Sequence, residues 1–178
     1  VLEGQKRYGL AVIQYNTAAE AFSKCGAKGL LLKNKLSLAR LSILGNDYIA
    51  AEELLNEASL LLTSSQFQLN YLKPDLLKES ARLELFLNRK ENALNLINQA
   101  LLSSDNFDQR LRETEIKKLA ADIYEQMGRA EEAFDYRRNA DQVLKEMGHA
   151  VAFDYFSNLR SSYEKARKEL IITRKQTT

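Results

Sequence analysis

Small apolar residues recur along this chain at a long and nearly constant period. Ala11, Ala51, Ala93 and Ala133 lie 40, 42 and 40 residues apart. A second alanine follows each of them seven positions later, at Ala18, Ala58, Ala100 and Ala140. The position four residues after each first alanine holds Tyr15, Leu55, Ile97 or Arg137. Spacings of four and then three place these positions on one helix face, and recurrence at a long period is typical of stacked helical repeats.

The hydrophobic periodicity and its interruptions predict eight helices. Gly45, Gly128 and Gly148 follow periodic stretches, as C-terminal caps of helices do. Asn46 and Asp47 are both suited to cap the helix after them, and Asn88 with Glu91 three residues later has the form of a capping box. The expected helices span residues 4–25, 29–45, 47–64, 74–88, 90–103, 108–127, 130–147 and 150–174.

Each repeat is predicted to be a pair of antiparallel helices. A further small residue lies twelve positions before the key alanine, at Ala39, Ala81 and Ala121, where it lets two helix backbones approach closely. Short joints inside a pair make its helices antiparallel, and the pairs must stack because none can bury its apolar face alone. The predicted fold is all-α, a right-handed superhelical stack of antiparallel helix pairs. Residues 1–148 are expected to form a leading helix and three pairs, and 149–178 a long C-terminal helix.

These residues resemble the tetratricopeptide repeat (TPR) in type and spacing. The resemblance is carried by Ala121–Asp122–Ile123–Tyr124, Gly128, Ala133 and Ala140, and by Asp47–Tyr48–Ile49–Ala50–Ala51 with Leu55 and Ala58. In the middle unit Asn88 stands where the family has a turn glycine. The usual TPR unit is about 34 residues long. The longer period here resembles a long-helix subclass found in bacterial signalling and peptide-sensing regulators, over residues 5–147.

The segment after Gly148 follows a different pattern. Its apolar positions alternate spacings of four and three, as in the seam of a two-stranded coiled coil. The predicted dimer seam consists of Phe156, Leu159, Tyr163, Ala166 and Leu170. For the first half of the segment, a helix that caps the last repeat is an equal alternative, whereas from Tyr163 onward a seam or exit helix is favoured. Ser161–Leu170 resembles the basic helix that leads, in bacterial receptors, from a TPR domain into a diguanylate cyclase or histidine kinase output.

Composition narrows the classes of partner and compartment. The chain carries 26 basic and 24 acidic residues, and a net charge of +2 argues against nucleic-acid binding. One cysteine cannot form an internal disulfide, so that a reducing compartment and a cytoplasmic location are the default. A periplasmic location would require an upstream signal and a downstream membrane span. No run of 18 apolar residues predicts a membrane span, and a start in mid-helix suggests a piece of a longer protein.

Candidate catalytic and metal-binding residues are few. His149 is the single histidine and follows Gly148 between two expected helices, where a joint residue is the favoured interpretation over a phosphoacceptor. Cys25 has no histidine near it in sequence and is interpreted as a buried or idle thiol. Gly26 and Gly29 are too sparse to cradle a phosphate. We therefore predict no enzyme activity, no catalytic residue, no metal and no cofactor.

The resemblance to TPR domains implies a binding groove lined by the first helix of each pair. The implied partner-binding residues are Leu36, Arg40, Ile43, Lys78, Arg82, Phe86, Lys118 and Asp122. Four basic side chains against one acidic side chain suggest a mildly electropositive groove, suited to an acidic or carboxylate-ended peptide. An ordinary solvated surface is the alternative. The Lys/Asn pattern of the carboxylate clamp in chaperone-binding relatives is not reproduced here.

Two functional hypotheses follow. The first is a sensory or regulatory module of a bacterial signalling protein that binds a protein or peptide, is not itself catalytic, and forms a homodimer through its C-terminal helix. The second is a stand-alone TPR scaffold or adaptor that assembles a protein complex.

Overall fold

The computed structural model describes residues 2–65, 68–103 and 110–148, with side chains described from residue 9 onward. Its helices are α1 (Leu2–Lys24), α2 (Lys28–Leu44), α3 (Tyr48–Thr63), a 3-10 turn η1 (Asn70–Leu72), α4 (Lys73–Phe86), α5 (Lys90–Leu102) and α6 (Arg110–Gln126). A further helix occupies residues 130–148. These ranges contain no strand, which confirms the predicted all-α class. The helix expected over 150–174 lies outside the described residues.

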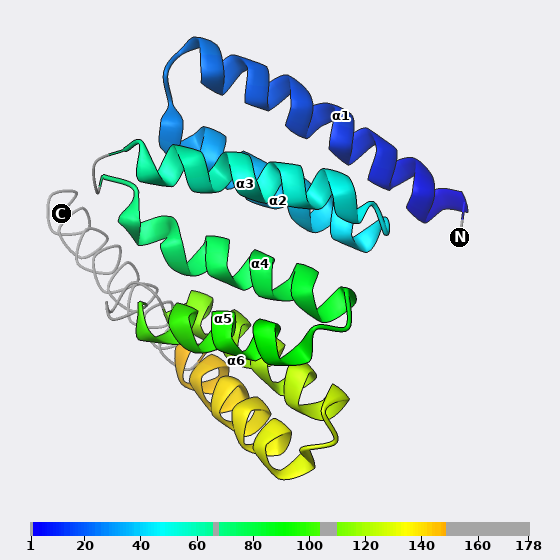
Figure 1. Cartoon of the computed structure of the whole chain (residues 1–178), viewed down its shortest axis with the longest axis vertical. Helices are drawn as coiled ribbons and strands as arrows, with labels where there is room; N and C mark the ends of the chain where they lie inside the picture. The colour runs from blue at the N-terminus through cyan, green and yellow to red at the C-terminus, as the bar shows by residue number, and fades with distance from the viewer. Residues whose placement is uncertain (1, 66–67, 104–109, 149–178) are drawn as a thin grey trace, which may run out of the picture.

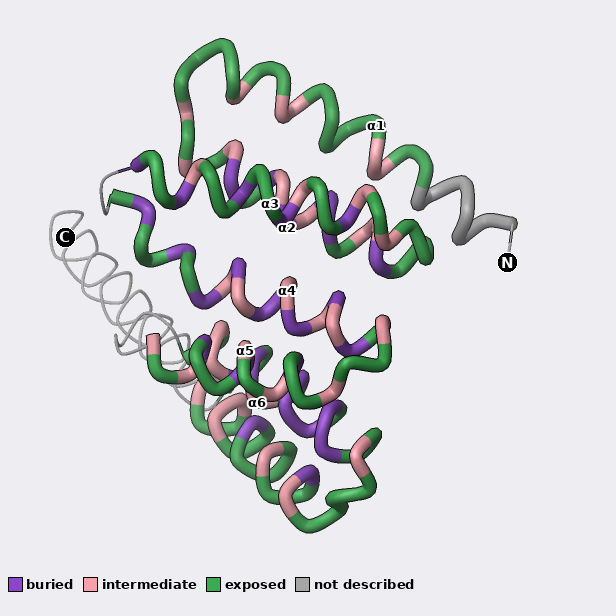
Figure 2. The backbone as a smooth tube through the Cα atoms, viewed as in Figure 1, coloured by how far each residue is buried: buried purple, intermediate pink, exposed green. Residues whose placement is uncertain are grey.

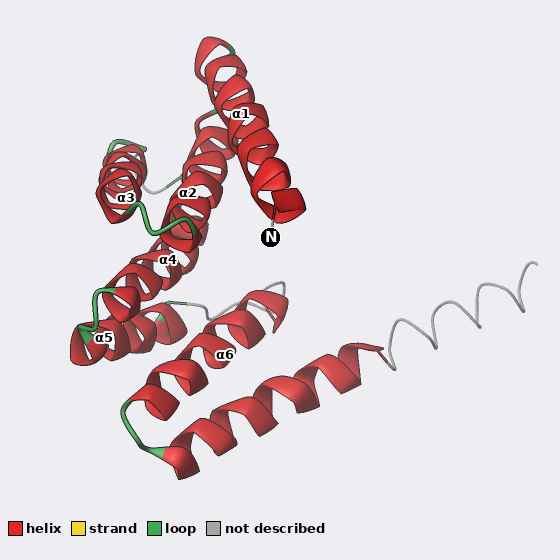
Figure 3. Ribbon diagram, turned by 90° about the vertical axis from the view of Figure 1, so that its right-hand side faces the viewer, coloured by secondary structure: helices red, strands yellow, loops and turns green. Residues whose placement is uncertain are grey.

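The helices form a stack in which each one runs opposite to the helix before it (Figure 1). The rows of the stack are the pairs α2–α3, α4–α5 and α6 with the 130–148 helix, preceded by α1. Of the first helices, α2 packs against α4 and α4 against α6. Figure 3 shows α3 and α5 on one side of the row made by α2 and α4. The stack of antiparallel pairs is therefore present, and its superhelical hand stays a prediction.

The three turns inside the pairs have the same conformation. Asn46, Asn88 and Gly128 have φ values of 62°, 60° and 77°, in the left-handed region where glycine and asparagine are tolerated best. In each turn the next N–H donates to the carbonyl five residues earlier, closing the last turn of the first helix. These bonds are Asp47 to Ser42 (2.9 Å), Arg89 to Glu84 (2.8 Å) and Arg129 to Tyr124 (2.9 Å).

This shared turn decides how the expected residues at the helix ends are used. Gly45 is the C-cap of α2, as expected, but its φ is −84°, and the left-handed residue of the turn is Asn46, which therefore does not cap α3. The capping box expected from Asn88 is absent, because Arg89 is the N-cap of α5 and makes no capping side-chain bond. Asn88 instead fills the role of the missing turn glycine. The cap predicted at Asp47 is confirmed, since its carboxylate accepts a hydrogen bond from the Ala50 N–H at 3.1 Å.

The recurring alanines lie where the helices of a pair meet. Ala51, Ala58, Ala93 and Ala100 are fully buried, as are Ala39, Ala81 and Ala121 on the partner helices. One apolar cluster joins α2, α3, η1 and α4, and a second joins α4, α5 and α6. Burial is concentrated in these helices, whereas the described part of α1 contains only partly buried and exposed residues (Figure 2).

No helix in the described ranges could span a membrane. None of them is both long enough and apolar enough to cross a bilayer.

Candidate partner-binding groove

The first helices of the three pairs carry two adjoining hollows on one surface, which we call the groove. The larger, of about 320 Å³, is lined by Lys33, Leu36, Ser37, Arg40, Asp75, Lys78, Glu79 and Arg112. The smaller, of about 180 Å³, is lined by Arg40, Arg82, Glu115, Lys118, Leu119 and Asp122. Arg40 borders both hollows, which makes them neighbours on a surface built by α2, α4 and α6.

Six of the eight implied groove residues line these hollows, namely Leu36, Arg40, Lys78, Arg82, Lys118 and Asp122. Ile43 does not, because it is fully buried in the apolar cluster shared with α3. Phe86 lies at the end of α4, where its ring packs against the ring of Tyr48 with centroids 6.4 Å apart. Ile43 is therefore a core residue, and Phe86 lies outside both hollows.

Lys78 forms the charged centre of the groove. Its side chain is only 7% exposed, and its Nζ lies 2.5 Å from Glu115 Oε2 on α6. Two carboxylates of its own helix are farther away, with Glu79 at 3.6 Å and Asp75 at 3.9 Å. A buried ammonium requires such partners, because an unpaired charge in this position would be strongly destabilising.

The two other carboxylates around Lys78 are themselves held by arginines. Asp75 Oδ2 is 3.0 Å from Arg112 Nε, and Glu79 Oε2 is 2.9 Å from Arg82 Nε. Arg112 also donates to the Tyr71 carbonyl at 2.9 Å and so ties α6 to η1. The network therefore bridges neighbouring repeats across the groove.

The network shifts two carboxyl pKa values in opposite directions. Burial raises the pKa of Asp75 above its ordinary value, and the charges of Arg112 and Lys78 only partly oppose this effect. Burial would also raise the pKa of Glu115, but the hydrogen bond and the charge of Lys78, with the charges of Arg40 and Arg82, outweigh it and lower that pKa. Glu115 is thus held as a carboxylate by the surrounding cations.

Arg40 is the exposed cation at the centre of the groove. It forms no ion pair within the described part of the chain, although its charge acts on Glu115. At the far end, Lys118 and Asp122 face the 130–148 helix, where Lys118 lies 4.0 Å from Asp141 and Asp122 lies 3.1 Å from Arg137. Arg40 is therefore available to a partner.

The sequence pattern identified only part of this surface. Asp75, Glu79, Arg112 and Glu115 were not among the implied groove residues. Asp75, Glu79 and Glu115 each lie three positions before an implied residue, whereas Arg112 lies six positions before Lys118. Extending each helix face by one turn finds the three carboxylates, and Arg112 requires almost a second turn. Together with these four residues and Lys33, the two hollows carry six basic and four acidic side chains. The excess of basic over acidic side chains is therefore smaller than the implied residues alone suggested, because those included four basic side chains and only one acidic side chain.

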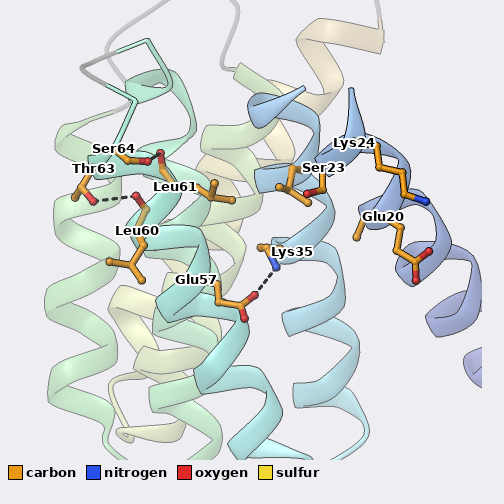
Figure 4. A pocket seen from close by; sticks show the side chains of 11 residues that line it. Glu20, Ser23, Lys24, Lys35, Glu57, Leu60, Leu61, Thr63 and Ser64 are labelled. Atoms are coloured by element: carbon orange, nitrogen blue, oxygen red, sulfur yellow. Dashed lines mark hydrogen bonds and ion pairs between the residues drawn. The ribbon is translucent and has the colours of Figure 1, made fainter. Parts of the chain in front are cut away.

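A third hollow, larger than both hollows of the groove at about 990 Å³, lies between α1, α2 and α3 (Figure 4). Its walls include Ala19 of α1, Leu31 of α2, and Leu60 and Leu61 of α3. An ion pair between Lys35 and Glu57 crosses it, and Leu60 is 69% exposed. This surface was not predicted, since α1 and α3 are separated in sequence by the whole of α2.

The remaining sequence candidates are Cys25, His149 and the predicted seam. Cys25 is exposed rather than buried, and its Sγ donates to the Phe22 carbonyl at 3.5 Å. His149 and the predicted seam residues Phe156, Leu159, Tyr163, Ala166 and Leu170 lie outside the described residues. Among the side chains described, no three histidine, cysteine, aspartate or glutamate residues are grouped so as to hold a metal ion.

Comparison with known proteins supports the fold alone. No protein-family model matches the chain, and no curated protein matches it significantly. The crystal structure of BtubC (BKLC) from P. vanneervenii superimposes with a TM-score of 0.64 at 20% sequence identity, covering 79% of this chain. The matched region is 58% of the BtubC chain, so this chain spans less than two thirds of that protein's length. The described helices thus share their arrangement with a known helical protein.

Proposed function

We propose that this chain is a protein- or peptide-binding helical repeat module of the TPR type that is not itself catalytic. The observation that carries this proposal is the groove, two adjoining hollows along α2, α4 and α6. Concave surfaces built by successive repeats are the usual binding surfaces of such stacks. A partner lying along this groove would contact all three pairs at once.

The charges of the groove favour a partner segment that carries carboxylates. Six basic and four acidic side chains line the hollows, and most of the acids are already paired with groove cations. Arg40 is exposed and Arg82 still has guanidinium N–H groups beyond the Nε that binds Glu79. Planar guanidinium groups bind carboxylates well, which supports an acidic or carboxylate-ended peptide.

A regulatory role in a bacterial signalling protein is the favoured context. It is supported by the TPR resemblance and by the seven-residue periodicity of 149–178, a pattern that would let a homodimeric helix pass the bound state to an output domain. A stand-alone scaffold or adaptor is the second candidate. The apolar hollow between α1 and α3 favours it, because an adaptor needs a second surface separate from the groove.

The test is binding of labelled peptides that differ only in charge. Acidic, neutral and basic peptides of equal length are titrated by fluorescence anisotropy against the wild type and Arg40→Glu. Arg40→Glu is expected to weaken binding of the acidic peptide while circular dichroism stays unchanged. Arg138→Glu is the matched control, because Arg138 is exposed on the 130–148 helix, where it pairs with Asp135 one turn away and lies over the Phe134 ring, and it lines neither hollow of the groove. Equal binding by both variants would exclude the groove as the binding surface.

A further inference from the structure

We propose that Glu115 is a displaceable internal ligand, which occupies a carboxylate-binding site formed by Lys78, Arg82 and Arg40 until a partner's carboxylate replaces it. This inference rests on the proposed function and adds both the chemistry of the site and its regulation. The site lies where the two hollows of the groove adjoin, between α2, α4 and α6.

Of the three carboxylates described around it, Lys78 contacts Glu115 most closely. The 2.5 Å distance to Glu115 contrasts with 3.6 Å to Glu79 and 3.9 Å to Asp75. The latter two carboxylates are engaged more closely by Arg82 and Arg112. Removing Glu115 would therefore leave the ammonium of Lys78 without a close hydrogen-bond acceptor among these carboxylates.

Glu115 itself is held loosely by comparison. Its side chain is 50% exposed, whereas that of Lys78 is 7% exposed, so the carboxylate can turn into water without moving the backbone of α6. It forms no other ion pair within the described ranges. Release of Glu115 breaks its ion pair with Lys78, which is partly exposed to water on the Glu115 side. An incoming carboxylate would then pair with the buried ammonium of Lys78 again.

The surroundings suit a second carboxylate. Arg40 and Arg82 line the same small hollow as Glu115, and the charges of both act on its carboxylate. The hollow measures about 180 Å³, several times the roughly 30 Å³ that one water occupies. A glutamate or aspartate side chain, or a peptide C-terminus, could therefore meet Lys78 while its other oxygen is held by an arginine.

Exchange at this site would also alter the contact between repeats. Lys78 belongs to α4 and Glu115 to α6, so their ion pair links the second pair to the third. A partner that takes Lys78 breaks this link and leaves the Asp75–Arg112 pair as the remaining ionic bridge there. Ligand binding is thereby coupled to how firmly α6 and the following helix are held.

The test uses a hexaglutamate peptide with fluorescein coupled to its N-terminal amine and a free C-terminus as the probe. Glu115→Ala is expected to bind it about tenfold more tightly than the wild type, the gain for a site that is open about a tenth of the time. Glu113→Ala is the matched control, because Glu113 is on the same helix but pairs with Lys117 and lines neither hollow. Its affinity should stay within about twofold of wild type, since only a partly exposed pair within one helix is lost.

Equal tightening by Glu113→Ala and Glu115→Ala would overturn the inference, because it would reflect net charge alone. Arg40→Gln separates this failure from failure of the proposed function. If Arg40→Gln weakens probe binding while Glu115→Ala has no effect, the groove binds acids but Glu115 does not compete. If neither variant changes probe binding, the groove itself is misplaced.

A second measurement covers the case in which Glu115→Ala does not fold. In the wild type, the Glu115 side-chain carboxyl is followed by carbon-13 NMR with and without saturating probe. The pKa of Glu115 is lowered in the free protein, chiefly because Lys78 and the nearby arginines outweigh the opposing effect of burial. Displacement predicts that the probe returns this pKa toward its ordinary value. An unchanged pKa in the probe-saturated protein would contradict the exchange.

Discussion

Helices α1 and α3 carry the same alanine spacing, but only α3 buries it. Ala51 and Ala58 of α3 are fully buried, whereas Ala11 and Ala18 of α1 are partly exposed (Figure 2). The difference follows from their neighbours, because α3 packs against both α2 and α4 while α1 packs chiefly against α2. The spacing thus identifies a packing face, but the energy it contributes depends on the helices that cover it.

The largest expected effect is at a fully covered alanine. Ala93→Leu should destabilise the protein by ~1–3 kcal/mol, because the added carbons overpack the contact between α5 and α4. The same substitution at Ala11 should change stability by no more than about 0.5 kcal/mol, since Ala11 is only partly buried. Urea unfolding followed by circular dichroism measures both. Equal losses for the two variants would mean that α1 is as well covered as α5.

An intermediate effect is expected at the turn that sets the alanine register. Asn88→Ala should cost about 1 kcal/mol, because alanine tolerates φ +60° less well than asparagine does. Asn88→Gly should be neutral or slightly stabilising, as glycine takes this conformation without a side-chain penalty. The control is Asn98→Ala on the exposed surface of α5. Thermal melts in which Asn88→Ala matches Asn98→Ala would show that the left-handed turn contributes little to the pair.

The smallest effect is expected at the ion pair between Lys78 of α4 and Glu115 of α6. The described side chains of α1 form no comparable ion pair with a neighbouring helix. The pKa of Glu115 is lowered in the folded state, so its pairing stabilises the protein above the carboxyl's unfolded pKa. This contribution is lost as the pH falls through the lowered folded pKa. Glu115→Gln should therefore reduce the acid dependence of stability by a few tenths of a kcal/mol, as expected for a half-exposed pair. Urea midpoints measured from neutral pH into this acid range test the difference.

The helix pairs could be predicted from the sequence because their packing depends on local spacing. Four and three residues between small side chains define one face whatever lies opposite, and the observed helices start and end within a few residues of the expected ranges. The turns were less predictable, because asparagine serves equally as a helix cap and as a left-handed residue. The left-handed residue lies five positions before Ala51, Ala93 and Ala133 in each pair, and this shared position is what distinguishes a left-handed asparagine from a capping one.

The groove could be predicted only in part, because it depends on contacts between helices distant in sequence. The face of each first helix was identified well enough to place Arg40 and Lys78 there. The approach of α6 to α4, which brings Glu115 to Lys78, leaves no mark in the local spacing. Ile43 was wrongly predicted to line the groove because it lies two helical turns after Leu36, on the same face of α2. At Ile43 this face packs against α3 in the apolar core.

The common turn geometry has a consequence for how such a chain can grow. Because Asn46 and Asn88 occupy equivalent places, the 42 residues from Asn46 to Leu87 begin and end at matching points of the stack. Inserting a copy of this segment would preserve every left-handed turn and every alanine register, and it would lengthen the groove by one unit. A graded series of such proteins would recognise correspondingly longer partner segments, so the length of the ligand becomes a property that can be set by whole-unit duplication.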